Sequence, residues 1–305
     1  MTTVRDSAPA PVNPPVVLSF AASDPTCGSG MQADLLTIAA LGGHPLTVIT
    51  AITVQDTAGV EAILPIDADW IVDQARQVLE DIPVAAFKLG LLGSIEAIAG
   101  IAEILADYPD IPVVFDPVLA SGRGDQLSDE NMIEAMIALL LPLTTVLTPN
   151  SLEARRLAQE LGPDDDDDDK NDDQGNTAND DPALAECARR LISTGCEYVL
   201  LTGTHEGTGN VVNTLYGSHG ALRADTWERL PGRYHGSGCT LAAALATHLA
   251  LGIDLPDAIA GAQEYTWNAL AAGYRPGMGQ YIPDRLFWAR QPEDAINDED
   301  AGAIV

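Results

Sequence analysis

Short apolar runs rich in Val and Ile alternate along the chain with longer segments in which apolar residues recur with a helical period. The short runs are typical of strands buried on both faces of a parallel sheet, and the longer segments are typical of helices that connect such strands. Strands are predicted at residues 16–20, 47–54, 85–89, 113–116, 145–148 and 198–201. Helices are predicted at residues 31–41, 68–79, 95–106, 130–140, 152–161 and 183–193.

The pattern changes toward the carboxyl end of the chain. Two alternating runs at 210–216 and 221–227 flank a glycine-bounded turn and predict an antiparallel hairpin. Helices at 239–251 and 256–272 follow it. The elements together predict an α/β fold with a central, mostly parallel sheet flanked by helices on both faces.

Three polar segments interrupt or flank this pattern. Residues 164–181 contain ten Asp and one Lys, and such a segment cannot bury enough apolar surface to order itself. The sequence predicts a disordered acidic insertion at 162–182, a disordered N-terminal arm at 1–14 and a mobile acidic tail at 291–305. One domain, residues 15–290, is expected between the two ends.

Composition narrows the classes of function. The 305 residues are 46% hydrophobic, which is enough for one large core, and the formal charge of −30 disfavours nonspecific binding to nucleic acid or to an anionic membrane. Apolar runs such as 133–143 are too short to span a bilayer, and the first residues lack the apolar core of a signal peptide. The expected location is the cytoplasm. The four cysteines show no CxxC pairing and are expected to be reduced thiols.

The clearest candidate for chemistry is the segment 235–240, which reads HGSGCT and leads into an Ala-rich helix. Its glycines leave the first helical N–H groups bare, and such a helix end attracts anions. Cys239 lies in the first turn, where the helix dipole favours a thiolate that could accept a proton. The alternative is a small buried Cys at a helix start, and the spacing alone leaves both interpretations open.

A second candidate follows the first predicted strand. Residues 23–34 read SDPTCGSGMQAD, in which Asp24 and the spaced glycines predict a tight polar loop. Asp34 lies about one turn into the next helix, with its carboxylate expected to be free to reach a ligand. A plain turn between a strand and a helix would have the same glycines, so this loop is weak evidence by itself.

The motifs, taken together and in order over residues 16–273, resemble those of hydroxymethylpyrimidine and phosphomethylpyrimidine kinases of thiamin biosynthesis, in the ribokinase-like superfamily. The segment 235–239 is similar to HGTGC and residues 23–34 are similar to TDPSGGAGIQAD. Shorter matches are residues 51–57 with TALVAQNT, 88–92 with KIGML, 114–119 with LDPVM and 150–153 with NxxE.

The resemblance implies ATP-dependent phosphorylation of 4-amino-5-hydroxymethyl-2-methylpyrimidine and of its monophosphate, with Mg²⁺ and in a homodimer. It implies Cys239 as the base and an anion hole at Gly236, Ser237 and Gly238. The implied pyrimidine-binding residues are Asp34, Gln55, Gly28, Leu91 and Val118. The implied nucleotide-binding residues are Asn150, Thr202, Gly203 and Arg123, and the implied metal-binding residues are Glu153 and Asp116.

Several of these residues also have an ordinary structural interpretation. The alternatives are a helix capping box for Asn150 and Glu153, core packing for Leu91 and Val118, and hydrogen bonds to their own loops for Gln55 and Asp116.

The chain departs from the family pattern at several positions. Residues 202–205 read TGTH where the family usually has KGGH, so Thr202 cannot offer a lysine's charge to phosphates. Ala22 and Cys27 stand where the family usually has Gly, and Gly122 and Arg123 replace a Lys-Ser pair. Only Lys88 and Lys170 are lysines, which suggests the hypothesis that Arg123 supplies the missing charge.

Two alternative functions remain open from the sequence. Pyridoxal kinases of the same superfamily phosphorylate a hydroxymethyl ring of similar size. A non-catalytic pyrimidine sensor that kept the fold is the alternative from another class, motivated by Thr202 and Ala22. No GxxxxGK[ST] motif occurs, so the chain is not a P-loop kinase.

Overall fold

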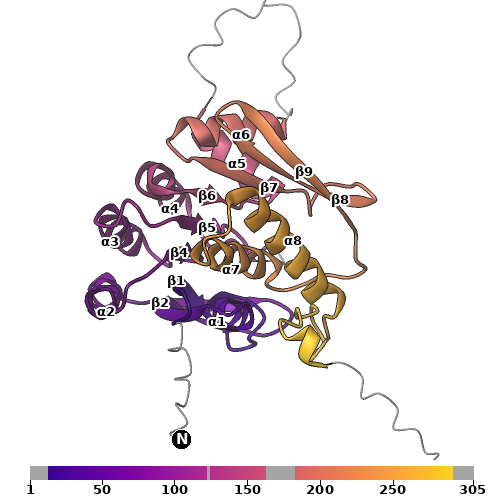
Figure 1. Cartoon of the computed structure of the whole chain (residues 1–305), viewed down its shortest axis with the longest axis horizontal. Coiled ribbons are helices and arrows are strands. Elements are labelled where there is room, and N and C mark those ends of the chain that lie inside the picture. The colour runs from indigo at the N-terminus through magenta and orange to yellow at the C-terminus, as the bar shows by residue number, and fades with distance from the viewer. Residues whose placement is uncertain (1–12, 122–123, 163–182, 291–305) are drawn as a thin grey trace, which may run out of the picture.

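The structure is a computed structural model that describes residues 13–121, 124–162 and 183–290. Within these residues nine strands form one sheet in the order β3-β2-β1-β4-β5-β6-β7-β8-β9 (Figure 1). The strands are β1 (Val16–Ser23), β2 (His44–Gln55), β3 (Val60–Pro65), β4 (Ala86–Leu89), β5 (Val113–Phe115), β6 (Val146–Leu147), β7 (Tyr198–Thr202), β8 (Asn210–Gly217) and β9 (Gly220–Glu228). The α-helices are α1 (Gly30–Ala40), α2 (Ala68–Asp81), α3 (Ile95–Ala106), α4 (Glu130–Ala135), α5 (Ser151–Glu160), α6 (Leu184–Ser193), α7 (Ser237–Ala250) and α8 (Leu255–Ala271).

The sheet is mostly parallel, as the sequence predicts. Strand β1 pairs in parallel with β2 and β4, and the parallel pairing continues through β5, β6 and β7. Strand β3 pairs antiparallel with β2 at one edge, while β8 and β9 form the predicted antiparallel hairpin at the other edge.

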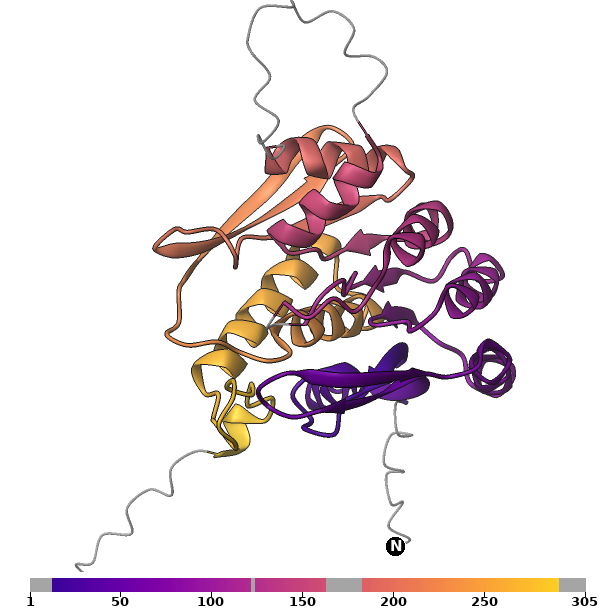
Figure 2. The same ribbon diagram turned by 180° about the vertical axis from the view of Figure 1, so that it is seen from behind.

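Helices cover both faces of this sheet because the parallel strands are apolar on both faces. Val17 of β1 packs into one core with residues of α1, α7 and α8, while Leu18 packs into the other core with residues of α2 to α6. Figure 1 shows α1, α7 and α8 on one side of the sheet and α2, α3 and α4 on the other, and Figure 2 shows the same layers from behind. The predicted flanking of both faces is confirmed.

Two features differ from the prediction. Strand β3 was not expected, because most of its side chains are exposed and its sequence lacks the apolar run of a buried strand. The helix expected at 130–140 is α-helical only over α4 and continues as a π-helical turn, Met136–Leu140, and a 3₁₀ turn, Leu141–Leu143. Pro142 has no N–H to donate, so the α-helical pattern cannot continue there.

The parallel strands bring the predicted site loops to one edge of the sheet. The amide of Gly90, after β4, donates to the carbonyl of Phe20 in β1, and the amide of Asp116, after β5, donates to Leu89 in β4. The amide of Thr148, after β6, donates to Phe115 in β5. Each strand end is thus bonded to its neighbour, and ligands in such sheets bind beyond this edge.

The chain after α8 returns across the same edge. The amide of Asp284 donates to the carbonyl of Ala269, and the amide of His235 donates to the carbonyl of Tyr281. The segment 273–290 therefore packs beside the residues that precede α7.

Among the described residues no helix combines the length and the apolarity needed to cross a membrane. The predicted arm, insertion and tail fall on residues 1–12, 163–182 and 291–305 and on their immediate boundaries, and these three segments lie outside the described residues. The same holds for Arg123.

Candidate active site

The carboxylate of Asp24, directly after β1, is the hydrogen-bond centre of the loop that follows. Its Oδ1 accepts from the amide of Thr26 at 2.8 Å and its Oδ2 from the amide of Ser29 at 2.7 Å, and His235 Nε2 lies 2.8 Å from Oδ2. Burial alone would raise the pKa of Asp24, but the hydrogen bonds from His235, Ser29 and Thr26 outweigh burial and hold that pKa well below its usual range. Asp24 therefore stays ionised and ties this loop to the start of α7.

Gly236 connects this loop to α7 by close backbone contact. Its φ of +87° is in the left-handed region, and a Cβ at this position would collide with the carbonyl oxygen of Gly28. Helix α7 has no side-chain cap at its amino end, and Gly238 in its first turn is exposed. The structure thus brings Gly28, Gly236, Ser237 and Gly238 together around bare amides, an arrangement suited to an anion.

Cys239 lies in the first turn of α7, where it is buried beside the carboxylate of Asp116. Burial raises the pKa of the Cys239 thiol to about 12, although the ammonium group of Lys88 acts in the opposite direction. The expectation that the helix dipole favours a thiolate is therefore wrong for the protein without substrates, because burial outweighs the dipole. The charge of Asp116, next to this thiol, acts on its pKa in the same direction as burial.

Asp34 does not have the free carboxylate that the sequence suggested. It is fully buried on α1, and its Oδ2 accepts from Ser19 Oγ at 2.6 Å and forms an ion pair of 2.8 Å with Lys88 Nζ. Burial opposes the charge on Lys88, but Asp34, Cys239 and Asp116 outweigh it and raise the pKa of the amine. Oδ1 of Asp34 is buried and has no hydrogen-bond partner in the described part of the chain.

Asp116 and Glu153 form a pair of buried carboxyl groups after β5 and at the start of α5. Burial raises the pKa of Glu153 to about 8, and the charge of Asp116 adds to this shift. Burial also raises the pKa of Asp116, to about 6. Glu153 and Asn150 form the capping box that the alternative interpretation predicted, with Glu153 Oε2 accepting from the amide of Asn150 at 2.9 Å.

These two carboxyl groups fit a hard divalent cation, because a positive charge would relieve the repulsion and desolvation that raise both pKa values. No group of three or more His, Cys, Asp and Glu side chains in the described ranges is arranged to hold a metal ion. A site with two carboxylates remains compatible with Mg²⁺, which keeps several of its waters.

An apolar wall lies beside these polar groups. Leu91 is buried in a small cluster with Ala22 and Ala51, and Val118 packs against the cluster. Core packing and a pocket wall are compatible here, because the cluster lies at the strand ends. Gln55 is half-buried at the end of β2, and its side-chain amide forms no hydrogen bond with any described residue. The predicted bond from Gln55 to its own loop is therefore absent.

Three of the four predicted nucleotide residues, Asn150, Thr202 and Gly203, also come together. Asn150 and Thr202 are paired across β6 and β7, and the amide of Thr202 donates to the carbonyl of Pro149 at 2.9 Å. The amide of Gly203 donates to Asn213 Oδ1 at 3.2 Å, and a Cβ at Gly203 would collide with the carbonyl oxygen of Val212. Glycine is therefore required there by close packing.

Arg285 was missed by the sequence analysis. Its side chain is buried, and its guanidinium donates to the carbonyls of Cys27 and Gly28 and to Thr240 Oγ1, with the Gly28 contact at 2.6 Å. Cys27 itself has φ +59°, the left-handed backbone that suits the family's usual Gly. The only sequence signal for Arg285 was an arginine in an acidic chain, outside every motif.

Comparisons with known proteins agree with the resemblance carried by the motifs. The family model described as phosphomethylpyrimidine kinase matches residues 24–284. The chain is 39% identical over 272 residues to the hydroxymethylpyrimidine/phosphomethylpyrimidine kinase of Streptomyces coelicolor. This alignment covers 88% of this chain and 93% of the relative.

Two solved structures show the same fold. An ADP complex of Bacillus subtilis pyridoxal kinase matches with a TM-score of 0.77 and 26% identity over 92% of this chain and 100% of the other. The phosphomethylpyrimidine kinase from Clostridium difficile matches with a TM-score of 0.67 and 32% identity, over 84% and 99%. The fold is the ribokinase-like fold that the motifs implied.

Replacing Lys88 with Met is expected to lower the free energy of unfolding by about 3 to 5 kcal/mol, because it leaves Asp34 buried without a counter-charge. The double variant Lys88→Met/Asp34→Asn should recover part of this loss. Urea unfolding followed by circular dichroism measures both. A single variant within 1 kcal/mol of wild type would contradict the assigned ion pair.

The raised pKa of Glu153 predicts that stability falls as the pH rises. Its folded pKa is about 8 against an ordinary value of 4.5, so between these values the unfolded state releases a proton that the folded state retains. The free energy of unfolding should decrease from about pH 5 to about pH 8, and the Glu153→Gln variant should show a shallower decrease. Urea unfolding in EDTA at several pH values tests this. The exposed Glu103→Gln variant on α3 is the control, and equal slopes for wild type and Glu153→Gln would refute the assignment.

Proposed function

The chain belongs to the phosphomethylpyrimidine kinase family, and from this premise we propose that it transfers the γ-phosphate of ATP to 4-amino-5-hydroxymethyl-2-methylpyrimidine and then phosphorylates the monophosphate, in thiamin biosynthesis. Membership in a kinase family makes it a phosphotransferase and disfavours the non-catalytic sensor. The observation that carries the proposal is the meeting of the bare amides of α7, the Cys239 thiol and the Asp116 carboxylate.

The pyrimidine ring would lie against Leu91 and Val118, near the amide of Gln55. This amide has both a donor and an acceptor free, as the edge of an aminopyrimidine requires. The unpaired Oδ1 of Asp34 and the backbone of Gly28 complete the proposed substrate contacts.

Phosphoryl transfer would proceed by in-line attack of the hydroxymethyl oxygen on the γ-phosphorus of ATP. The new O–P bond forms as the bond to the ADP leaving group breaks. The hydroxyl proton would pass to the sulfur of Cys239 while the thiol's own proton passes to the Asp116 carboxylate. The bare amides of Gly236, Ser237 and Gly238 would stabilise the charge on the transferring phosphate.

The nucleotide would bind beside Asn150, Thr202 and Gly203, at the ends of β6 and β7. A neighbour of the same fold, B. subtilis pyridoxal kinase, is described as an ADP complex, which supports a nucleotide site in this fold. The carboxyl groups of Asp116 and Glu153 would hold Mg²⁺, which when bound neutralises phosphate charge. The role of Arg123 stays a hypothesis.

Pyridoxal is the second candidate substrate, because the structural match to pyridoxal kinase covers 92% of this chain. The apolar wall and the Gln55 amide would accept either ring, so a direct comparison of the two substrates is needed. The homodimer and the cytoplasmic location remain predictions, which size-exclusion chromatography and cell fractionation test.

Coupled ADP release with Mg·ATP tests the proposed reaction. Turnover is expected with the pyrimidine above that with pyridoxal, and Cys239→Ala should reduce kcat by about 10²- to 10⁴-fold because the proton acceptor is lost. Cys187→Ala, which removes a buried thiol in α6, is the control and should retain turnover. Absence of turnover on both rings by folded wild-type protein would contradict the proposed function, and an active Cys239→Ala would remove Cys239 from its role.

A further inference from the structure

Arg233 differs from every other arginine in the described residues. Its guanidinium has no hydrogen-bond or ion-pair partner there, and its side chain is exposed. The other described arginines form ion pairs or bind backbone carbonyls: Arg76, Arg155, Arg156, Arg189, Arg190, Arg223, Arg229, Arg275, Arg285 and Arg290. An unpaired cation is unexpected in a chain with a formal charge of −30. Carboxylates are abundant, yet none that the structure describes pairs with Arg233.

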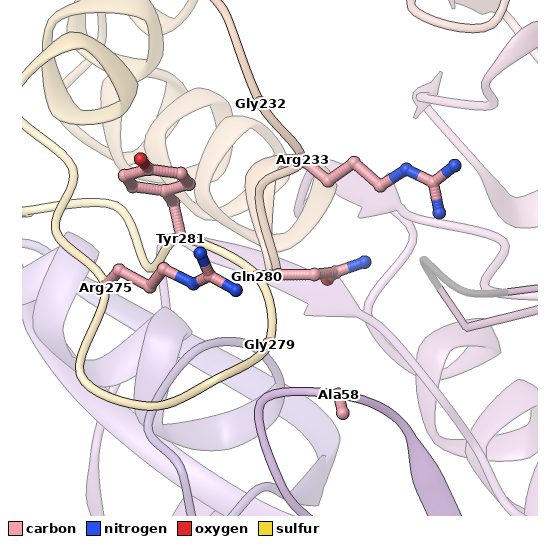
Figure 3. A pocket seen from close by; sticks show the side chains of 7 residues that line it. All are labelled: Ala58, Gly232, Arg233, Arg275, Gly279, Gln280 and Tyr281. Atoms are coloured by element: carbon pink, nitrogen blue, oxygen red, sulfur yellow. The ribbon is translucent and has the colours of Figure 1, made fainter.

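Arg233 lines a pocket of about 520 Å³, a volume within the range of small-molecule sites. The pocket is formed by three segments that are far apart in the sequence: Ala58 in the turn between β2 and β3, the loop before α7 and the loop after α8 (Figure 3). The side chains of Arg233 and Gln280 extend in the same direction in Figure 3. Arg275, also in the lining, donates to the carbonyl of Met278.

Backbone hydrogen bonds hold the three walls together. The amide of Tyr281 donates to the carbonyl of Arg233 at 2.9 Å, and the amide of Gln280 donates to the carbonyl of Thr57 at 2.7 Å. The carboxylate in the turn, Asp56, accepts from the amides of Ala58 and Gly59 and is thereby held within its own turn. The pocket therefore has fixed walls and a positive lining.

Two of the pocket residues, Gly232 and Arg233, belong to the segment that leads into α7. Arg233 is three positions before Gly236, and the intervening His235 is fixed by Asp24 and by the carbonyl of Tyr281. The usual family lysine is replaced by Thr202, and Lys88 is buried in its ion pair with Asp34. Arg233 is thus an available positive charge for a phosphate, on the segment that leads to the anion hole.

We propose that the pocket lined by Arg233, Arg275 and Gln280 binds a phosphate group of the substrates, with Arg233 supplying the charge that Thr202 does not. Guanidinium is suited to this role because it offers two parallel donors to phosphate oxygens. The inference rests on the proposed function. The phosphate can come from ATP or from the pyrimidine monophosphate, and separate measurements for the two steps distinguish these sources.

The test compares Arg233→Gln with Arg233→Lys and with Arg76→Gln. The last variant removes a charge of the same sign from the ion pair between Arg76 on α2 and Asp107 after α3. KM is measured for Mg·ATP, for the unphosphorylated pyrimidine and for its monophosphate. Binding of ADP and of the monophosphate is measured by calorimetry, which does not require turnover. Arg233→Gln should raise KM and Kd for a phosphate-bearing ligand by about 10- to 100-fold. Arg233→Lys should raise both constants by less, and Arg76→Gln should leave both constants unchanged.

The pattern of losses identifies the ligand. Weaker ADP binding with a raised KM for ATP in both steps assigns the pocket to the nucleotide, and a loss confined to the monophosphate assigns it to the second substrate. Arg233→Gln values within about twofold of the Arg76→Gln control for both ligands would overturn the proposal. Because calorimetry gives this comparison even if wild-type protein turns over neither ring, failure of the proposed reaction and failure of the pocket are distinguishable.

Discussion

The close approach of Gly236 to the carbonyl oxygen of Gly28 is the constraint on which the rest of the site depends. It joins the loop after β1, at one end of the sequence, to the first turn of α7, near the other end. The hydrogen bond between Asp24 and His235 stabilises this contact, and Arg285 stabilises it further by donating to the carbonyls of Cys27 and Gly28. The bare amides and Cys239 acquire their positions from this junction.

Buried charge is the second organising feature. In the described part of the chain Lys88 is the one lysine, and it lies among Asp34, Asp116 and Cys239 rather than on the surface. Lys88 pairs directly with Asp34. Burial raises the pKa values of Asp116 and Glu153, and the charge of Asp34 adds to the shift of Asp116 as the charge of Asp116 adds to that of Glu153. The pKa values of Asp116 and Glu153 therefore lie close to neutral pH, where both carboxyl groups can respond to a cation or a proton.

Much of the fold follows from sequence patterns because the buried strands and the amphipathic helices have strong, distinct periods. Strand β3 was not predicted, because it is an exposed edge strand and lacks the apolar pattern of a buried strand. The glycines at 236 and 238 were recognisable because their chemistry is local to the start of one helix. Leu91 and Val118 were found through the resemblance, and the structure adds that they pack around one cluster.

Properties that depend on contacts between distant segments could not be derived from the sequence. The ion pair of Asp34 with Lys88 joins α1 to β4, and the contacts of Arg285 join residues more than 250 positions apart. The raised pKa of Cys239 depends on burial by surrounding elements, whereas the sequence showed only its place in the helix. The sequence likewise could not show that the guanidinium of Arg233 is free, because this depends on the three-dimensional contacts of the described residues.

The account is tested most directly by measuring turnover of Gly236→Ala beside Gly252→Ala. Both glycines have positive φ and flank α7, but only a Cβ at Gly236 would collide with the loop after β1, whereas Gly252 has open space. The account predicts that Gly236→Ala loses about 100-fold or more in kcat while circular dichroism shows a folded protein, and that Gly252→Ala retains turnover. Equal turnover of the two variants would contradict the claim that the junction of Gly28 and Gly236 builds the phosphoryl-transfer site.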